Sequence, residues 1–179
     1  MDQEVKDENS WFQSTPDSWR EFYETDVLSA VRMVQVTVSG MKSRGWGRII
    51  QIGTGLANTP QAVLADYAAA KAALVNMTVS LAKALAGTNI TVNTISPGVI
   101  GTAGVETVLK NAAERLGWGD DWPTIQKNWF EKMLHDHNVQ RLGRVEEVAE
   151  LVAFVASPVA GYINGANLRI DGGLSPSIN

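Results

Sequence analysis

Three short apolar runs, separated by long helical patterns, place the strongest limit on how this 179-residue chain can fold. The runs are residues 48–52, 90–95 and 167–170. The first two are short and mostly apolar or β-branched, which favours buried strands of a parallel sheet, and the third is a shorter run of the same kind. Strands that alternate with helices predict an α/β fold in which right-handed crossovers join parallel strands.

Helical patterns fill the intervals between these runs. Thr15-Pro16-Asp17 combines a hydroxyl cap, an early proline and an early carboxylate, so we expect a helix from Thr15 to about Ser43, after an irregular segment 1–14. A second, Ala- and Leu-rich helix is expected from Leu64 to Ala86, where Gly87 ends it. Residues 103–137 predict one or two amphipathic helices, and residues 146–156 another. The apolar face of the first helix comprises Phe22, Val27, Val31, Val34, Val38 and Met41.

Composition excludes several classes of function. Hydrophobic residues make up 45% of the chain, enough for a core, and the net charge of −4 comes without a dense basic cluster, which argues against a nucleic-acid partner. The absence of cysteine rules out disulfides and thiolate metal sites. No apolar run approaches the roughly 20 residues of a membrane span. Residues 1–10 are acidic and polar, unlike a signal peptide, so we expect a cytoplasmic protein with no membrane partner.

Tyr67 and Lys71 carry the first chemical signal, because i and i+4 side chains share one face of a helix. A nearby ammonium stabilises a phenolate and makes tyrosine a usable general acid/base. The spacing by itself is common in helices, and a packed tyrosine beside a solvated lysine would explain it equally well. Its surroundings therefore decide how the pair is interpreted.

Those surroundings form an ordered set of motifs. Thr54 stands thirteen residues before Tyr67, at the end of the first run, where ligands of parallel sheets bind. The later motifs lie at residues 93–102, 141–149, 162–165 and 170–173. From about Thr15 to Gly173 the chain resembles the classical short-chain dehydrogenase/reductase family, and is similar to the 3-oxoacyl-carrier-protein reductases and related alcohol dehydrogenases. The resemblance implies the C-terminal part of a Rossmann-like, doubly wound sheet with helices on both faces.

The resemblance also implies an activity and roles for particular residues. It implies an NAD- or NADP-dependent oxidoreductase that interconverts a secondary alcohol and a carbonyl by hydride transfer. Tyr67 would exchange the proton, Lys71 would stabilise the phenolate and bind the nicotinamide ribose, and Thr54 would polarise the substrate oxygen. The residues at positions that cradle the nicotinamide are Pro97, Gly98, Ile100 and Thr102.

Two positions depart from the family pattern. Thr54 replaces the usual serine, with Gly53 before it where a second serine is frequent, so the hydroxyl remains but the pocket changes. Asp26 stands where the family carries the asparagine that holds a water on the proton path. Its carboxylate would either partly cancel the charge of Lys71 or turn aside to solvent, leaving only the backbone carbonyl to act; the sequence leaves both alternatives open.

Residues 103–137 occupy the position of the family's substrate lid and contain Trp118, Trp122 and Trp129. Each tryptophan is expected to pack the lid against the core, although one of them lining an apolar substrate pocket is the sharper alternative. His135 and His137 are two residues apart, so we interpret them as surface residues and expect no metal site.

The family's glycine-rich cofactor loop has no counterpart in these 179 residues, so 1–179 is expected to be one partial domain. We favour an incomplete sequence of a longer enzyme over a truncated product or a half supplied by a second chain. The strand at 48–52 would then have one unpaired edge. The competing function is a cofactor-free oligomerising or binding module. The helices from Thr15 to Ser43 and from Leu64 to Ala86 correspond to those that form the family's homodimer and homotetramer contacts.

Overall fold

The computed structural model describes residues 11–134 and 138–176 and contains, in that part of the chain, a parallel sheet of three strands. The strands are β1 (Gly47–Ile52), β2 (Ile90–Pro97) and β3 (Asn167–Ile170), in the order β1-β2-β3. Gly47 lies opposite Ile90, and Thr94 lies opposite Asn167. The prediction of an α/β fold with a parallel sheet is confirmed; β1 begins one residue earlier than expected and β2 continues through Pro97.

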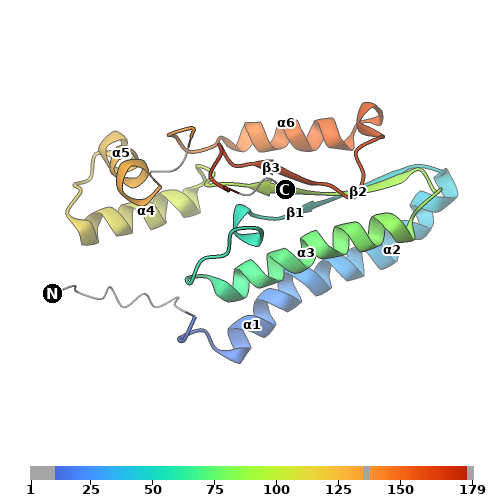
Figure 1. Ribbon diagram of the computed structural model, residues 1–179, viewed down its shortest axis with the longest axis horizontal. Helices are drawn as coiled ribbons and strands as arrows, with labels where there is room; N and C mark the ends of the chain where they lie inside the picture. The colour runs from blue at the N-terminus through green and yellow to red at the C-terminus, as the bar shows by residue number, and fades with distance from the viewer. Residues whose placement is uncertain (1–10, 135–137, 177–179) are drawn as a thin grey trace.

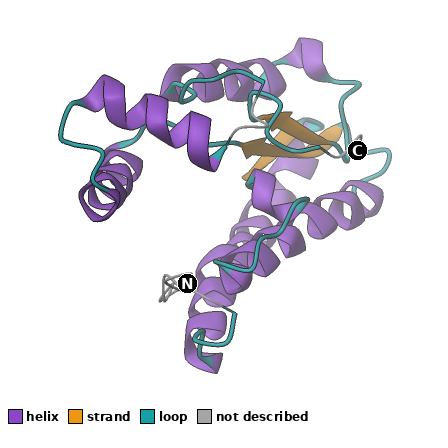
Figure 2. Cartoon of the chain, turned by 60° about the vertical axis from the view of Figure 1, so that its left-hand side comes forward, coloured by secondary structure: helices purple, strands orange, loops and turns teal. Residues whose placement is uncertain are grey.

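Helices cover both faces of this sheet, as the doubly wound architecture requires (Figure 1). On one face lie α2 (Ser29–Arg44) and α3 (Ala65–Ala84), and on the other lies α6 (Val145–Ala156). The chain leaves the carboxyl end of β2 into α4 (Ala103–Leu116) and α5 (Trp122–Met133), which extend beyond the end of the sheet (Figures 1 and 2). Short 3-10 turns follow β1 and α6, at η2 (Gly55–Ala57) and η3 (Pro158–Ala160).

The core lies where α2 and α3 pack against the sheet. Val92 and Ile95 of β2 are completely buried, as expected for a central strand with helices on both faces. Gly47 lies so close to Met41 that an added Cβ would come within 2.6 Å of its sulfur, which explains a glycine where the chain turns from α2 into β1. One cluster around this contact comprises Ala82, Leu85, Ile90 and Val92, with Val38, Met41, Ile49 and Leu81 packed against it.

Two helix predictions need correction. The expected single helix from Thr15 to Ser43 is instead α1 (Pro16–Phe22), a π-helical segment η1 (Tyr23–Leu28) and α2. Within η1 Val27 is buried, and the wider π turns shift the register of the side chains that follow. The helix expected over 64–86 ends at Ala84, because the buried Leu85 already leaves helical geometry two residues before Gly87.

β1 is an edge strand within the described residues, as the sequence predicted. Its outer edge borders a groove of about 440 Å³ between β1 and α2, in which Asp26 and Lys71 lie at one end. Gln51 also lines this groove; its side-chain amide is buried, and neither amide atom has a hydrogen-bond partner among the described residues. No helix in residues 11–134 or 138–176 has the length and apolar character needed to span a membrane.

Candidate active site

Tyr67 and Lys71 lie in the first two turns of α3 and on one face of it, as their spacing predicts. Lys71 Nζ is 5.7 Å from the centre of the Tyr67 ring, close enough for the ammonium to act on the π-system and on a phenolate. The helix begins after Leu64, whose φ of 58° is a strained, left-handed conformation for a leucine. The start of the helix that carries the pair is therefore held by tertiary packing rather than by a favourable local conformation.

The Lys71 ammonium is fixed by two acceptors, one on η1 and one at the carboxyl end of β1. Lys71 Nζ donates to Asp26 Oδ1 at 2.9 Å and to the Ile52 carbonyl at 3.2 Å. The Lys71 and Asp26 side chains are only 14% and 17% exposed. An ammonium has three N–H donors, so one remains for a further acceptor.

Asp26 reaches Lys71 from the π-helical segment η1. Of the two alternatives that the sequence left open, the structure has the carboxylate turned towards Lys71 and not towards solvent. Single π turns occur most often at functional sites, where they redirect a side chain. The sequence contains the aspartate but no signal for the π turn that aims it.

Tyr67 is supported by contacts that the sequence did not predict. Phe22 of α1 packs against the Tyr67 ring in an edge-on arrangement with ring centres 5.6 Å apart. Asp66, which is 8% exposed, accepts the Tyr67 backbone N–H at 2.9 Å and the Ser18 hydroxyl at 2.7 Å. The buried carboxylate thus ties α1 to the start of α3. A carboxylate in the first turn of a helix was a visible signal, but its partner Ser18 was not.

Thr54 lies in the loop after β1, where it caps the turn η2 that packs against α3. Its hydroxyl oxygen accepts the Leu56 N–H at 3.4 Å, which leaves the hydroxyl proton free to be donated. Close packing explains the glycine at position 53, directly before Thr54. An added Cβ there would come within 2.7 Å of Ser96 Oγ and 2.8 Å of Thr94 Cγ2. A serine at position 53 would require the side chains of Ser96 and Thr94 to shift.

Besides Tyr67 and Lys71, the residues predicted to bind the cofactor lie at and after the carboxyl end of β2 and line two hollows, with Ile100 lining both. Pro97, Ile100 and Thr102 line an apolar depression of about 560 Å³ against α6. Gly98 lines a smaller cavity of about 220 Å³, and an added Cβ there would come within 2.8 Å of Asp171 Cα. Close packing against the turn after β3 therefore explains Gly98 without any ligand.

The proposed lid segment forms a small core of its own. Trp118, Trp122 and Trp129 pack around the buried Leu109, Ala113 and Ile125 of α4 and α5. The tryptophans therefore pack within the lid segment itself, whereas the sequence predicted that they would pack this segment against the core. His135 and His137 lie outside the described residues, and within the described ones no group of His, Asp and Glu side chains could hold a metal ion.

Comparison with known proteins agrees with this geometry. A family model described as enoyl-(acyl carrier protein) reductase matches residues 5–175. The chain belongs to the classical short-chain dehydrogenase/reductase family. It is 37% identical to the uncharacterized oxidoreductase YvaG of Bacillus subtilis (strain 168), a match that covers 94% of this chain and 63% of that protein. It is 35% identical to the 3-oxoacyl-(acyl-carrier-protein) reductase FabG of Vibrio cholerae, over 88% of this chain and 58% of FabG.

Solved structures of the family superpose well on the chain. The L-sorbose reductase of Gluconobacter frateurii, complexed with NADPH and L-sorbose, matches with a TM-score of 0.87 at 28% identity. That match covers 95% of this chain and 63% of the reductase. The chain thus spans about three fifths of the length of the relatives that it matches. The Rossmann-like fold, with helices on both faces of a parallel sheet, is confirmed by this similarity.

Proposed function

We propose that this chain is the catalytic part of an NAD(P)-dependent oxidoreductase that interconverts a secondary alcohol and a carbonyl compound by hydride transfer. The observation that carries the proposal is the half-buried Tyr67 with a Lys71 ammonium 5.7 Å from its ring, fixed by Asp26 and Ile52. Support comes from the relatives, which include NADPH-dependent reductases and FabG.

The residues at the end of β2 suit one part of a nicotinamide cofactor. Pro97 ends β2, and Ile100 and Thr102 follow it, so these residues lie at the carboxyl edge of the sheet, where ligands of parallel α/β sheets bind. The third N–H of Lys71 is available for a ribose hydroxyl. When bound, the nicotinamide supplies or accepts the hydride.

The chain's own residues would handle the proton. During reduction the Tyr67 hydroxyl gives its proton to the carbonyl oxygen, and the Lys71 ammonium stabilises the phenolate that is left. Thr54 donates a hydrogen bond from its hydroxyl to the same substrate oxygen and holds it near Tyr67, while keeping its own proton. In the direction of oxidation, the Tyr67 phenolate takes the proton from the alcohol.

The test measures the change in reduced-nicotinamide absorbance with a panel of carbonyls and alcohols. Tyr67→Phe should lower kcat by about 10²-fold or more, as expected for loss of a general acid/base. Tyr23→Phe is the matched control, because Tyr23 is 49% exposed on η1 and should leave turnover unchanged. Equal turnover in Tyr67→Phe and in the unmodified chain would contradict the mechanism.

A second candidate is a cofactor-free oligomerising or binding module. It is favoured by exposed apolar side chains on the two helices predicted to form the homodimer or homotetramer contact: Met33 and Val36 on α2 are 61% and 72% exposed, and Val79 on α3 is 42% exposed. Calorimetric titration with NAD(H) and NADP(H), together with sedimentation, separates the two functions. Oligomers that form without measurable nucleotide affinity would favour the module, whereas micromolar nucleotide binding would favour the oxidoreductase.

A further inference from the structure

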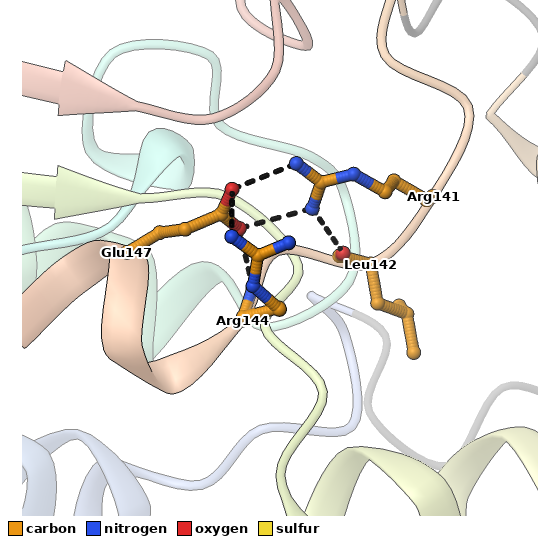
Figure 3. A network of polar contacts seen from close by, with 4 residues as sticks. All are labelled: Arg141, Leu142, Arg144 and Glu147. Carbon is orange, nitrogen blue, oxygen red and sulfur yellow. Dashed lines mark hydrogen bonds and ion pairs between the residues drawn. The ribbon is translucent and has the colours of Figure 1, made fainter.

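An ion-pair network lies at the start of α6 (Figure 3), the helix on the other face of the sheet from α3 (Figure 1). Arg141 donates through both terminal nitrogens to the two oxygens of Glu147, at 2.9 and 2.7 Å. The first of these nitrogens also donates to the Leu142 carbonyl at 3.0 Å. Glu147 in turn accepts the backbone N–H of Arg144 at 2.7 Å and so caps the helix. The network is therefore hydrogen-bonded to the backbone of the loop 141–144 at two points, the Leu142 carbonyl and the Arg144 N–H.

This loop is bonded directly to the segment that leaves β2. The Gly143 N–H donates to the Val99 carbonyl at 2.9 Å, and the Gly101 N–H donates to the Gly143 carbonyl at 2.8 Å. The two segments form an isolated parallel bridge between Ile100 and Gly143. An added Cβ on Gly143 would come within 2.6 Å of Ile100 Cδ1, so the Ile100 side chain packs directly over the Gly143 backbone.

The segment 99–102 connects the two parts of the candidate site. Ile100 and Thr102 line the apolar depression against α6, and both are among the residues predicted to contact the nicotinamide. Thr102 is also the N-cap of α4, where its hydroxyl oxygen accepts the Val105 N–H at 3.3 Å. The contacts that fix residues 99–102 therefore position both the residues predicted to contact the nicotinamide and the residue at which the lid segment begins.

We propose that Arg141 and Glu147 are positioning residues that hold the segment 99–102 in a single conformation. They thereby fix Ile100, which is predicted to contact the nicotinamide, and Thr102, at which α4 begins. Neither residue touches the reacting atoms; both act through the backbone of Leu142 and Arg144, the residues on either side of Gly143. A planar guanidinium bonded to both oxygens of a carboxylate fixes the orientation of both groups, which a single point contact does not do. The part of the proposal that concerns the cofactor rests on the proposed function.

The chain offers a matched control in Arg144. Its guanidinium contacts the same Glu147 carboxylate at 3.3 Å, and its side chain is 64% exposed. Arg144→Gln removes one positive charge beside Glu147 but leaves the Arg141–Glu147 pair and the backbone bond of Arg144 in place. Glu147→Gln is the sharper test variant, because glutamine still accepts the Arg144 N–H and keeps the helix cap while the ion pair is lost. Arg141→Met removes the other partner of the ion pair, together with the hydrogen bond to the Leu142 carbonyl.

Two readouts on the full 179-residue chain test the proposal separately from the proposed function. Hydrogen exchange of the Gly101 and Gly143 amides should accelerate about fivefold or more in Arg141→Met and in Glu147→Gln, but stay unchanged in Arg144→Gln. Arg141→Lys should give an intermediate rate, because an ammonium cannot bond to both carboxylate oxygens and the carbonyl in the same geometry. The affinity for NAD(H) or NADP(H), measured by calorimetric titration, should fall in the same order.

The possible failures are distinguishable. If the unmodified chain binds no nucleotide, the proposed function fails, while the exchange rates still decide whether the pair positions residues 99–102. If exchange at Gly101 and Gly143 is unchanged in both test variants, or accelerates equally in Arg144→Gln, the positioning role is overturned. If exchange accelerates as expected but nucleotide affinity stays constant, the proposed effect of the Arg141–Glu147 pair on cofactor binding is overturned.

Discussion

Replacement of Lys71 by methionine should destabilise the chain measurably, because it leaves the Asp26 carboxylate without its cation. The two charged groups are 2.9 Å apart and only 14% and 17% exposed. At an effective dielectric constant of about 20, such a pair attracts by roughly 6 kcal/mol, most of which is offset by the cost of removing both ions from water. Removing one partner of a fully buried pair costs about 3–5 kcal/mol. The residual exposure here lowers the expected loss in the free energy of unfolding to about 2–3 kcal/mol.

A double-mutant cycle measures the interaction itself. Asp26→Asn should cost about 1–2 kcal/mol, because its amide oxygen still accepts from Lys71 while the charge is lost. The double variant should cost about 1–2 kcal/mol less than the sum of the single variants, as measured by urea unfolding at neutral pH. Lys110→Met is the control: Lys110 and Glu106 are about half exposed on α4, and its loss should cost no more than about 0.5 kcal/mol. Additivity within about 0.5 kcal/mol for Asp26 and Lys71 would refute the ion pair.

Three further predictions concern the lid core, acid and the β1 edge. Leu109→Ala should lower the free energy of unfolding by about 2–4 kcal/mol, because Leu109 is 1% exposed. The control Val108→Ala, at a 59% exposed site, should lower it by less than about 1 kcal/mol. Urea titration measures both, and equal losses would contradict the packing of α4 on α5. The hydrogen bonds from the Arg141 side chain and the Arg144 backbone lower the pKa of Glu147 from 4.5 to about 2, so its stabilising contribution is complete above pH 4.5 and is lost as the pH falls towards 2. Glu147→Gln should therefore flatten the loss of stability over that range, and an unchanged pH profile would exclude the contribution. Gln51→Met should raise the free energy of unfolding by about 1–2 kcal/mol, because it removes a buried amide that has no hydrogen-bond partner among the described residues. A destabilised variant would show that this amide is hydrogen-bonded in solution.

Local pattern was enough to predict the strands and most of the helices. The runs that became β1 and β2 are bounded by glycine, asparagine or proline, and the burial of β2 on both faces leaves little freedom in how it pairs. The π-helical segment η1 could not be predicted, because its residues have ordinary helix-forming character. Its geometry is set by the buried Val27 and by the position of α3, both of which depend on tertiary packing. Periodicity analysis assumes 3.6 residues per turn and cannot detect such an insertion.

The candidate site divides in the same way. Side chains on one helix, such as Tyr67 and Lys71, were predicted because i and i+4 spacing alone brings them together. Contacts between distant segments were not: the bond from Ser18 to Asp66 spans 48 residues, and the bridge from Ile100 to Gly143 spans 43. The direction of the Asp26 carboxylate also depended on such a contact, so the sequence left it open. The roles of Thr54, Tyr67, Lys71 and Asp26 in catalysis stay predictions.

Lys71 lies in the groove along the outer edge of β1, but its two acceptors are held in place by contacts with β2 and α3. The Ile52 carbonyl that accepts from Lys71 belongs to the last residue of β1, whose side chain is 46% exposed. That residue is nevertheless held by its register with Ile95, and the next N–H, of Gly53, donates to the Ile95 carbonyl at 2.8 Å. Asp26 comes from η1, which packs on α3. Both acceptors of Lys71 are thus fixed by β2, η1 and α3, so pairing at the outer edge of β1 is not needed to orient the ammonium towards Tyr67.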